Sequence, residues 1–183
     1  MATIFDALDE SLTAWIRAQP MWFVATAPLS ADGHVNISPR GLDSFSVLSP
    51  HRVAWVDYTG SGVETIAHLR ENRRVCLMFA SFDTRPRIVR LHGLGSVSLP
   101  GETAFDEVVA LHPGHPSTRA VITVDLTRIS DACGWGVPIM ELTGERDLLR
   151  LQAEKKGPEA MAEYRATRNA RSIDGLPGFP LDG

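Results

Sequence analysis

A chain of 183 residues, of which 44 % are hydrophobic and 22 % charged, has the composition of one soluble globular domain with a buried core. Its net charge of −4 argues against nucleic acid and against an anionic membrane surface as partners, because both require a basic face. Two cysteines cannot form a disulfide framework, and there is neither the pattern of a signal peptide nor an apolar run of membrane-spanning length, so we expect a cytoplasmic protein.

The first third of the chain predicts one helix followed by short strands. Apolar residues at helical spacing predict a helix over 4–18, which Pro20 ends. Runs of β-type residues, separated by turn signals such as Asp32-Gly33, predict strands at 21–29, 35–38, 45–48 and 52–58.

The rest of the chain predicts three helices and three longer strands. The helices cover 62–72, 102–111 and 145–168, the last broken at Gly157-Pro158. The strands cover 74–81, 87–99 and 120–134, and a loop follows at 172–183. Gly93 and Gly95 lie inside a long strand, which is typical of a bulge or bend where a barrel curls.

Hairpins join most of these strands, and regular alternation of strand and helix is missing. The pattern therefore favours a mainly β (α+β) protein, a small antiparallel barrel with peripheral helices. We expect a single domain over 1–183, with a helix in 1–20, the barrel core in 21–135, and helices and a tail in 136–183.

The stretch "YTGSGVETIAHLREN" places a Gly60-Ser61-Gly62 turn between a strand and a helix. It is not a dinucleotide fingerprint, because Thr65 stands where a third glycine is needed, and the phosphate-loop motif is also missing. Backbone amides at a helix start attract phosphate. The turn alone leaves two interpretations open, a capped turn or an anion site.

The stretch "NISPRG" (36–41) is a second candidate. Pro39 cannot donate a ladder hydrogen bond, so its strand must be an edge or be interrupted there. The hairpin either simply ends at Pro39, or its backbone forms a rim for a flat ligand, with Arg40 reaching an anionic group.

Other candidate motifs carry less information. His112 and His115 have H-x-x-H spacing on a proline-rich loop without cysteines or carboxylates beside it, so we expect a solvated loop and no metal site. No Ser-His-Asp pattern stands out along the chain. Trp135 lies between two glycines and either caps a flat ring or covers the core.

Taken in order, several stretches resemble the pyridoxamine 5′-phosphate oxidase-like, FMN-binding split-barrel family. They are "FVATAPLSADGHVNISPRGLDSF", "RVAWVDYTGSGVETIAHLRENRRVCLMF", "PRIVRLHGLGSV", "CGWGVPIME" and "SIDGLPG". The resemblance implies a six-stranded antiparallel split β-barrel. It also implies a homodimer with two FMN sites at the subunit interface.

The same resemblance implies where FMN would lie. Its phosphate would lie near the glycine turn, with Arg40 as a ligand, and its ring along 35–41, with Arg87 near the ring. Trp135 would approach the flavin, from the same or the partner subunit. The implied cofactor-binding residues are Asn36, Ser38, Pro39, Arg40, Tyr58, Thr59, Ser61, Gly62, Thr65, Arg87 and Trp135.

Two departures from the family's name-giving enzyme argue against vitamin B6 oxidation. In that enzyme's pattern an Arg-Lys pair precedes an Ala-His helix segment. The equivalent residues of this chain, 64–66, include no cation. Its Arg- and Trp-rich end is replaced here by "SIDGLPGFPLDG". The resemblance then implies a flavin-dependent oxidoreductase of a small molecule, with an electron donor such as a nicotinamide nucleotide. Alternatives are a flavin carrier or sensor, or a split barrel that binds haem or a deazaflavin.

Overall fold

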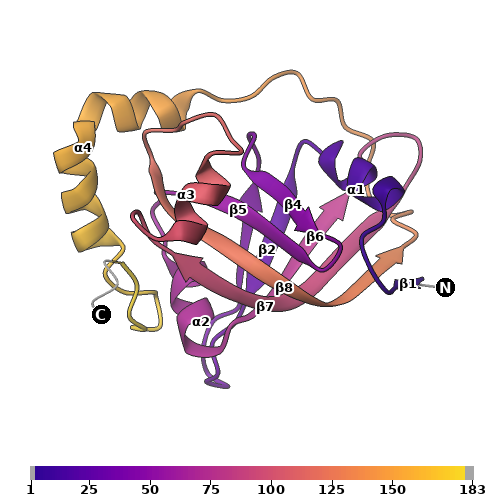
Figure 1. The fold of residues 1–183 in the computed structure, drawn as a ribbon, viewed down its shortest axis with the longest axis horizontal. Helices are drawn as coiled ribbons and strands as arrows, with labels where there is room; N and C mark the ends of the chain where they lie inside the picture. Colours follow the sequence, from indigo (N-terminus) through magenta and orange to yellow (C-terminus); the bar gives the residue numbers. More distant parts are fainter. Residues whose placement is uncertain (1–2, 180–183) are drawn as a thin grey trace.

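A computed structural model gives the fold and describes residues 3–179 (Figure 1). The strands are β1 (Ile4–Phe5), β2 (Trp22–Thr26), β3 (Asn36–Arg40), β4 (Phe45–Ser49), β5 (Arg52–Tyr58), β6 (Arg74–Ala80), β7 (Ile88–Ser98) and β8 (Thr118–Ala132). The helices are α1 (Glu10–Arg17), α2 (Glu64–Asn72), α3 (Thr103–Val109) and α4 (Leu148–Arg168).

All strands belong to one antiparallel sheet with the order β3-β2-β6-β7-β8-β5-β4, and β1 pairs with the end of β8. The sheet curls so that aromatic side chains of β2, β4, β5 and β6 meet in its interior. The ring centroids of Trp22 and Phe45 are 5.2 Å apart, and those of Phe45 and Phe79 are 5.0 Å apart. No backbone ladder joins β3 to β4 in residues 3–179, so the barrel is split between these two edges. The predicted antiparallel split barrel is confirmed, with eight strands where six were expected.

The predicted N-terminal helix begins later than its apolar pattern suggests. Ile4 and Phe5 pair with Ser130 and Ile129 of β8 and form β1. The Asp9 carboxylate accepts the Leu12 N–H at 2.7 Å and caps α1, which therefore begins at residue 10. Phe5 and Leu8 pack on the core from outside the helix, which a helical spacing rule cannot anticipate.

The bend predicted from glycines in the long strand β7 is confirmed. The pairing of β7 with β8 shifts register between His92 and Gly93. A Cβ atom at Gly93 would lie 2.4 Å from the backbone oxygen of Asp125, so any other residue would push the two strands apart.

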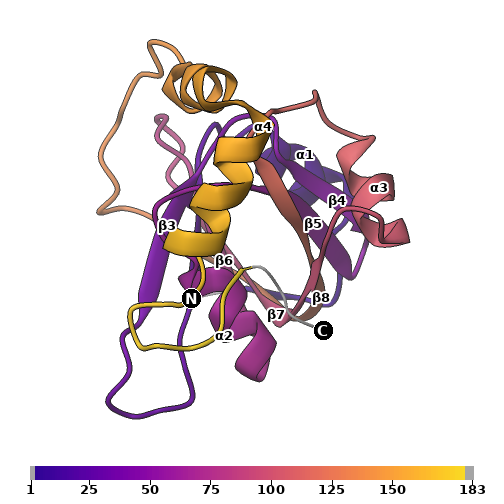
Figure 2. The same ribbon diagram turned by 90° about the vertical axis from the view of Figure 1, so that its left-hand side faces the viewer.

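The helices surround the barrel. α1 lies near one end and α4 near the other, and the segment 133–147, without helix or strand, arches between them (Figure 1). Figure 2 shows α4 across the barrel end, above α2. α4 breaks at Gly157, where φ is 76°, as predicted. Within residues 3–179 no helix is both long and apolar enough to cross a membrane.

The predicted loop after α4 is a packed turn rather than a loose one. The Ser172 N–H donates to the Leu176 carbonyl oxygen at 3.0 Å, and the Gly178 N–H to that of Ala170 at 2.9 Å. An Arg70 guanidinium N–H of α2 donates to the Gly178 carbonyl oxygen at 3.2 Å. This turn, residues 172–178, is held against α2 beside the glycine turn. The chain beyond residue 179 lies outside the described residues.

Candidate functional site

A cavity of about 180 Å³ lies where β3, the end of β5, the glycine turn and the start of α2 meet. We call it the glycine-turn cavity. Six of the predicted cofactor-binding residues line it, together with Gly60, Glu64 and Arg119. The six are Ser38, Arg40, Tyr58, Ser61, Gly62 and Thr65. The fold therefore brings together the two stretches that sequence patterns selected separately.

Strand β3 presents alternate residues to this cavity. Because side chains of a strand alternate between its faces, Ser38 and Arg40 are partly buried while Ile37 and Pro39 are exposed. Within residues 3–179, β3 pairs only with β2, so the edge position predicted from Pro39 is confirmed. The Pro39 side chain lies on the face opposite to Ser38 and Arg40.

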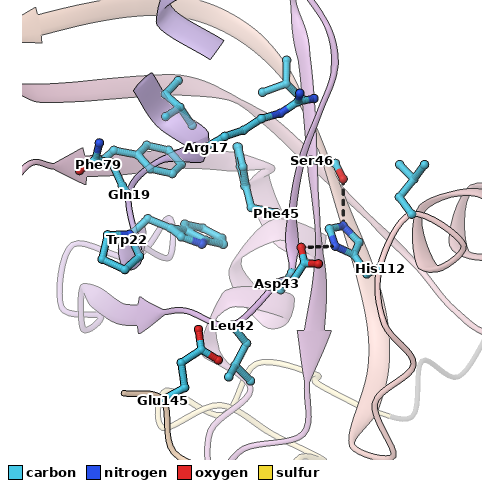
Figure 3. Close-up of a pocket in the computed structure, with 15 residues that line it drawn as sticks. Arg17, Gln19, Trp22, Leu42, Asp43, Phe45, Ser46, Phe79, His112 and Glu145 are labelled. Carbon is cyan, nitrogen blue, oxygen red and sulfur yellow. Dashed lines mark hydrogen bonds and ion pairs between the residues drawn. The ribbon is translucent and has the colours of Figure 1, made fainter. Parts of the chain in front are cut away.

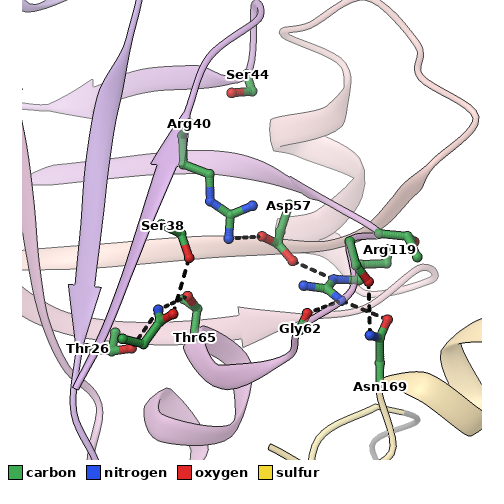
Figure 4. Close-up of polar contacts among 12 residues, drawn as sticks. Thr26, Ser38, Arg40, Ser44, Asp57, Gly62, Thr65, Arg119 and Asn169 are labelled. Carbon is green, nitrogen blue, oxygen red and sulfur yellow. Dashed lines mark hydrogen bonds and ion pairs between the residues drawn. The ribbon is translucent and has the colours of Figure 1, made fainter. Parts of the chain in front are cut away.

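A buried cluster of Arg40, Asp57 and Arg119, which we call the arginine cluster, forms the charged wall of the cavity. One oxygen of Asp57 lies 2.8 Å from the Arg40 guanidinium, and the other accepts from Arg119 Nε at 2.7 Å (Figure 4). The Arg40 contact has ion-pair distance without hydrogen-bond geometry, and Arg40 Nε has no partner in the described residues. Burial alone would raise the pKa of Asp57, but the two guanidinium groups hold that pKa below its ordinary value. Two cations facing one carboxylate leave the cluster with a net positive charge.

Arg119 also fixes the glycine turn itself. Its Nη1 donates to the Gly62 carbonyl oxygen at 3.1 Å and to Asn169 Oδ1 at 2.8 Å. The Asn169 amide nitrogen donates to the Gly60 carbonyl oxygen at 3.1 Å. Arg165 approaches Thr59 Oγ1 at 3.4 Å, and burial together with Arg119 lowers the pKa of Arg165. The turn is thus held by residues from the far end of the chain.

The N-terminus of α2 has both favourable and unfavourable features for an anion. Val63 precedes the helix and offers no side-chain cap to the free N–H groups. The Glu64 carboxylate, however, lines the cavity and accepts the Ile173 N–H at 3.3 Å. On the other side of the turn, Lys156 of α4 lines a cavity of about 280 Å³ with Thr59 and Ser61.

A chain of polar side chains runs from β3 into the core. Asn36 Nδ2 donates to Thr65 Oγ1 at 3.2 Å, and Thr26 Oγ1 lies 2.9 Å from His68 Nδ1. Ser38 Oγ donates to Asn36 Oδ1 at 3.3 Å. Burial lowers the pKa of His68, whose side chain is completely buried. These contacts fix the Asn36 side chain and, through it, Ser38 and Thr65, which line the cavity.

Two predicted residues lie away from the glycine-turn cavity of their own chain. Arg87 pairs with Asp131 at 3.0 Å, and its guanidinium lies 5.2 Å from the Trp15 ring centroid, at another cavity of about 560 Å³. Trp135 is 83 % exposed on the segment 133–147. One chain alone therefore does not bring Arg87 and Trp135 to the arginine cluster.

Three residues in and around this cluster, namely Asp57, Arg119 and Asn169, were not predicted from sequence patterns. Asp57 carried a signal, because it directly follows an apolar run in β5 and a buried charge needs a partner. Arg119 carried a weaker one, since it stands directly before an apolar run in a strand that also holds other charged residues. Asn169 carried none, since it follows a helix and precedes a turn, a common place for asparagine. Among residues 3–179 there is no group of three His, Cys, Asp or Glu side chains that would hold a metal ion.

A second cavity, of about 630 Å³, lies between the end of α1, β2, and the β3–β4 connection with β4. We call it the aromatic cavity, because Trp22, Phe45 and Phe79 form its wall (Figure 3). His112 also lines it, and the His112 side chain is only 3 % exposed. The expectation that this histidine lies on a solvated loop is wrong, because residues of the β3–β4 connection and of β4 enclose it.

The sequence model of the pyridoxamine 5′-phosphate oxidase family matches residues 8–133, more than half of the chain. This chain belongs to that family. A curated member is the pyridoxamine 5′-phosphate oxidase family protein ustO of Aspergillus flavus. It is 41 % identical over an alignment of 199 positions that covers 98 % of this chain and 78 % of the relative. The resemblance seen in the sequence is therefore confirmed at the level of the family.

Solved structures of lower identity share the fold. HupZ of Group A Streptococcus has a TM-score of 0.56 at 17 % identity, over 73 % of this chain and 99 % of that one. A candidate pyridoxamine 5′-phosphate oxidase of Lactobacillus delbrueckii has a TM-score of 0.54 at 18 % identity, over 68 % of this chain and 94 % of that one. At such identities the likeness concerns the barrel and not its ligand.

Proposed function

We propose that this protein binds FMN at the interface of a homodimer and acts as a flavin-dependent oxidoreductase on a small molecule. The observation that carries the proposal is the arginine cluster at the glycine-turn cavity, in a chain of the pyridoxamine 5′-phosphate oxidase family. Vitamin B6 oxidation itself is not proposed, because the cations expected before the Ala-His segment are missing.

The residues of the cavity suit a phosphate group. Arginine offers several N–H donors in a planar fork, and Arg40 and Arg119 together exceed the charge of Asp57 by one unit. Arg40 Nε is buried without a partner in the described residues and remains able to donate. The hydroxyl groups of Ser61 and Thr65 line the same cavity. Glu64 is the one group there that opposes an anion.

The size of the cavity supports a site shared between two subunits. Sites for small molecules usually measure about 300–1,000 Å³, and this cavity of about 180 Å³ suits the phosphate end of FMN alone. The flavin ring would then lie along the polar face of β3, an edge strand that another subunit would cover. The segment 133–147 carries exposed apolar side chains, Trp135 at 83 % and Ile139 at 71 %, which favours a partner surface.

When bound, FMN supplies hydride or electron transfer, and the protein supplies binding and orientation. Arg40 and Arg119 would hold the phosphate, and Asn36 and Ser38 would face the ring from β3. Arg87, which pairs with Asp131 in its own chain, would reach a flavin only from a neighbouring subunit. The electron donor we propose is a nicotinamide nucleotide.

The test is an absorption spectrum of the freshly purified protein, followed by titration of FMN with its fluorescence as the readout. Flavin bands, or saturable quenching at micromolar FMN, would support the proposal. A colourless protein that does not quench FMN would contradict it, and a Soret band would point to haem instead. Oxidation of NADH or NADPH by the FMN-loaded protein would separate an enzyme from a carrier or sensor. Light scattering would test the dimer.

A further inference from the structure

The aromatic cavity contains a chain of hydrogen-bonding side chains that flavin binding does not use. His112 Nδ1 lies 3.1 Å from Asp43 Oδ1, and His112 Nε2 lies 2.9 Å from Ser46 Oγ. In Figure 3 the imidazole of His112 lies between the other two side chains at the edge of the cavity. The three residues come from the β3–β4 connection, the loop after α3, and β4. All three line the cavity.

The chemistry of the three groups fixes the direction of the hydrogen bonds. An ionised carboxylate only accepts, so His112 Nδ1 must carry the proton that faces Asp43. In neutral imidazole Nε2 is then the acceptor, and Ser46 must donate its hydroxyl proton to it. This is the arrangement in which a histidine acts as general base toward a serine, while a carboxylate holds the tautomer.

The edge position of β4 adds donors for a developing negative charge. The Val56 N–H donates to the Ser44 carbonyl oxygen at 2.9 Å, which places Ser44 in a hydrogen-bonded pair with β5. Hydrogen-bonded and non-bonded pairs alternate in an antiparallel ladder, so the N–H groups of Phe45 and Val47 point away from β5. No strand covers that edge within residues 3–179. Both residues line the cavity on either side of Ser46, so they flank the serine with backbone donors.

The walls of the cavity indicate the class of substrate. Trp22, Phe45 and Phe79 give an aromatic surface, and Arg17 and Glu145 place a cation and a carboxylate on the same lining. Ser46 projects from the opposite face of β4 to Phe45, so the serine lies at the rim of this surface. The volume of about 630 Å³ is within the usual range for a small-molecule site. A compact ester with an apolar or aromatic acyl group fits these properties.

We propose that Ser46, His112 and Asp43 form a nucleophilic site that hydrolyses small carboxylic esters. Ser46 Oγ forms a bond to the acyl carbon while its proton passes to His112 Nε2. His112 gives that proton to the departing alcohol as the ester C–O bond breaks. Water, activated by the same histidine, then cleaves the acyl-serine, releases the carboxylic acid and restores Ser46. No oxidant, reductant or flavin takes part, so the activity is independent of the proposed FMN site.

The experiment follows hydrolysis of p-nitrophenyl acetate and butyrate by the full-length protein without added FMN. Loss of general-base and nucleophilic catalysis predicts that Ser46→Ala and His112→Ala each lower the rate by at least about 100-fold. Asp43→Asn lowers it by less, because the Asp43 side chain is 69 % exposed. A fluorophosphonate probe, followed by peptide mass spectrometry, locates the reactive serine at Ser46.

Matched controls separate chemistry from folding. Ser49→Ala removes a hydroxyl from the same strand, and His115→Ala removes the other histidine of the H-x-x-H motif, and neither changes the rate. Since Asp43 is exposed, Asp43→Asn keeps the test valid even where the buried variants unfold on thermal melting. Hydrolysis no faster than in buffer, a rate unaffected by Asp43→Asn in the folded protein, or labelling of another serine would each overturn the proposal.

Discussion

The glycine-turn cavity lies beside β3 and the aromatic cavity beside the β3–β4 connection and β4, and the two are built for different chemistry. The first is walled by fixed charges, with two guanidinium groups around the fully buried Asp57. The second has an aromatic wall and a hydrogen-bonded chain that runs from Asp43 through His112 to Ser46. Guanidinium groups suit the binding of an anion, whereas a serine–histidine–carboxylate chain suits proton transfer to and from a reacting group. One split barrel can therefore support binding on one side and proton transfer on the other.

The largest effect on stability is expected from the buried carboxylate. Asp57→Asn leaves Arg40 and Arg119 without their counter-charge, so we expect the free energy of unfolding to fall by about 3–5 kcal/mol. Urea unfolding followed by circular dichroism measures this loss. The matched control is Asp125→Asn, because Asp125 pairs with Arg52 on the surface and such a pair contributes only about 0–1 kcal/mol. Equal losses in the two variants would show that the cluster at Asp57 has no special role.

A double comparison tests whether the two cavities act separately. Arg40→Ala removes a charged donor worth about 1.5–3 kcal/mol, so we expect FMN affinity to fall more than about tenfold while ester hydrolysis stays unchanged. Ser46→Ala should abolish ester hydrolysis and leave FMN affinity unchanged. Arg128→Ala, an exposed arginine on β8, is the control for loss of one positive charge. FMN affinity that survives Arg40→Ala in fluorescence titrations would remove Arg40 from the site.

Glu64 allows a smaller adjustment of the anion site. Its carboxylate lies in the glycine-turn cavity at the start of α2, where it competes with a phosphate for the same helix terminus. One charge at a helix end is worth about 0.3–1 kcal/mol, so Glu64→Gln should tighten FMN binding by about twofold to fivefold. Glu71→Gln, in the last turn of α2, serves as the matched control. Weaker binding after Glu64→Gln would mean that this side chain supports the ligand.

The smallest effect concerns pH. Burial lowers the pKa of His68 below its ordinary value of 6.5, so the folded state binds fewer protons than the unfolded state as the pH falls. The stability linked to His68 is complete above pH 6.5 and declines below it, toward the pKa of the folded state. We expect the urea midpoint to drop between pH 7 and pH 5, and to drop less in His68→Gln. His51→Gln, at an exposed histidine, should leave the pH dependence as it is.

Local features of the fold could be predicted because neighbouring residues encode them. The glycine turn, helix α2, the edge position at Pro39 and the break at Gly157 all follow from backbone preferences of a few adjacent residues. The predicted start of α1 was wrong because it depends on distant residues. Ile4 and Phe5 are removed from the helix by pairing with residues about 125 positions away, and no local pattern contains that information.

The residues of the candidate sites likewise divide into those that local sequence patterns predict and those that only folding brings together. Sequence patterns alone located the glycine turn and Arg40, and the ordered set of motifs identified the family. Only folding brought Arg119 to Asp57 and Asn169 to Gly60, pairs separated by 62 and 109 residues. It likewise brought His112, expected on a solvated loop, against Asp43 and Ser46. The sequence by itself determined most of the elements, their order and the family, because backbone preference and apolar spacing act over short distances, whereas β1 required pairing with distant β8. The tertiary structure decided which charged and polar groups meet, because those contacts exist only once distant strands have packed together.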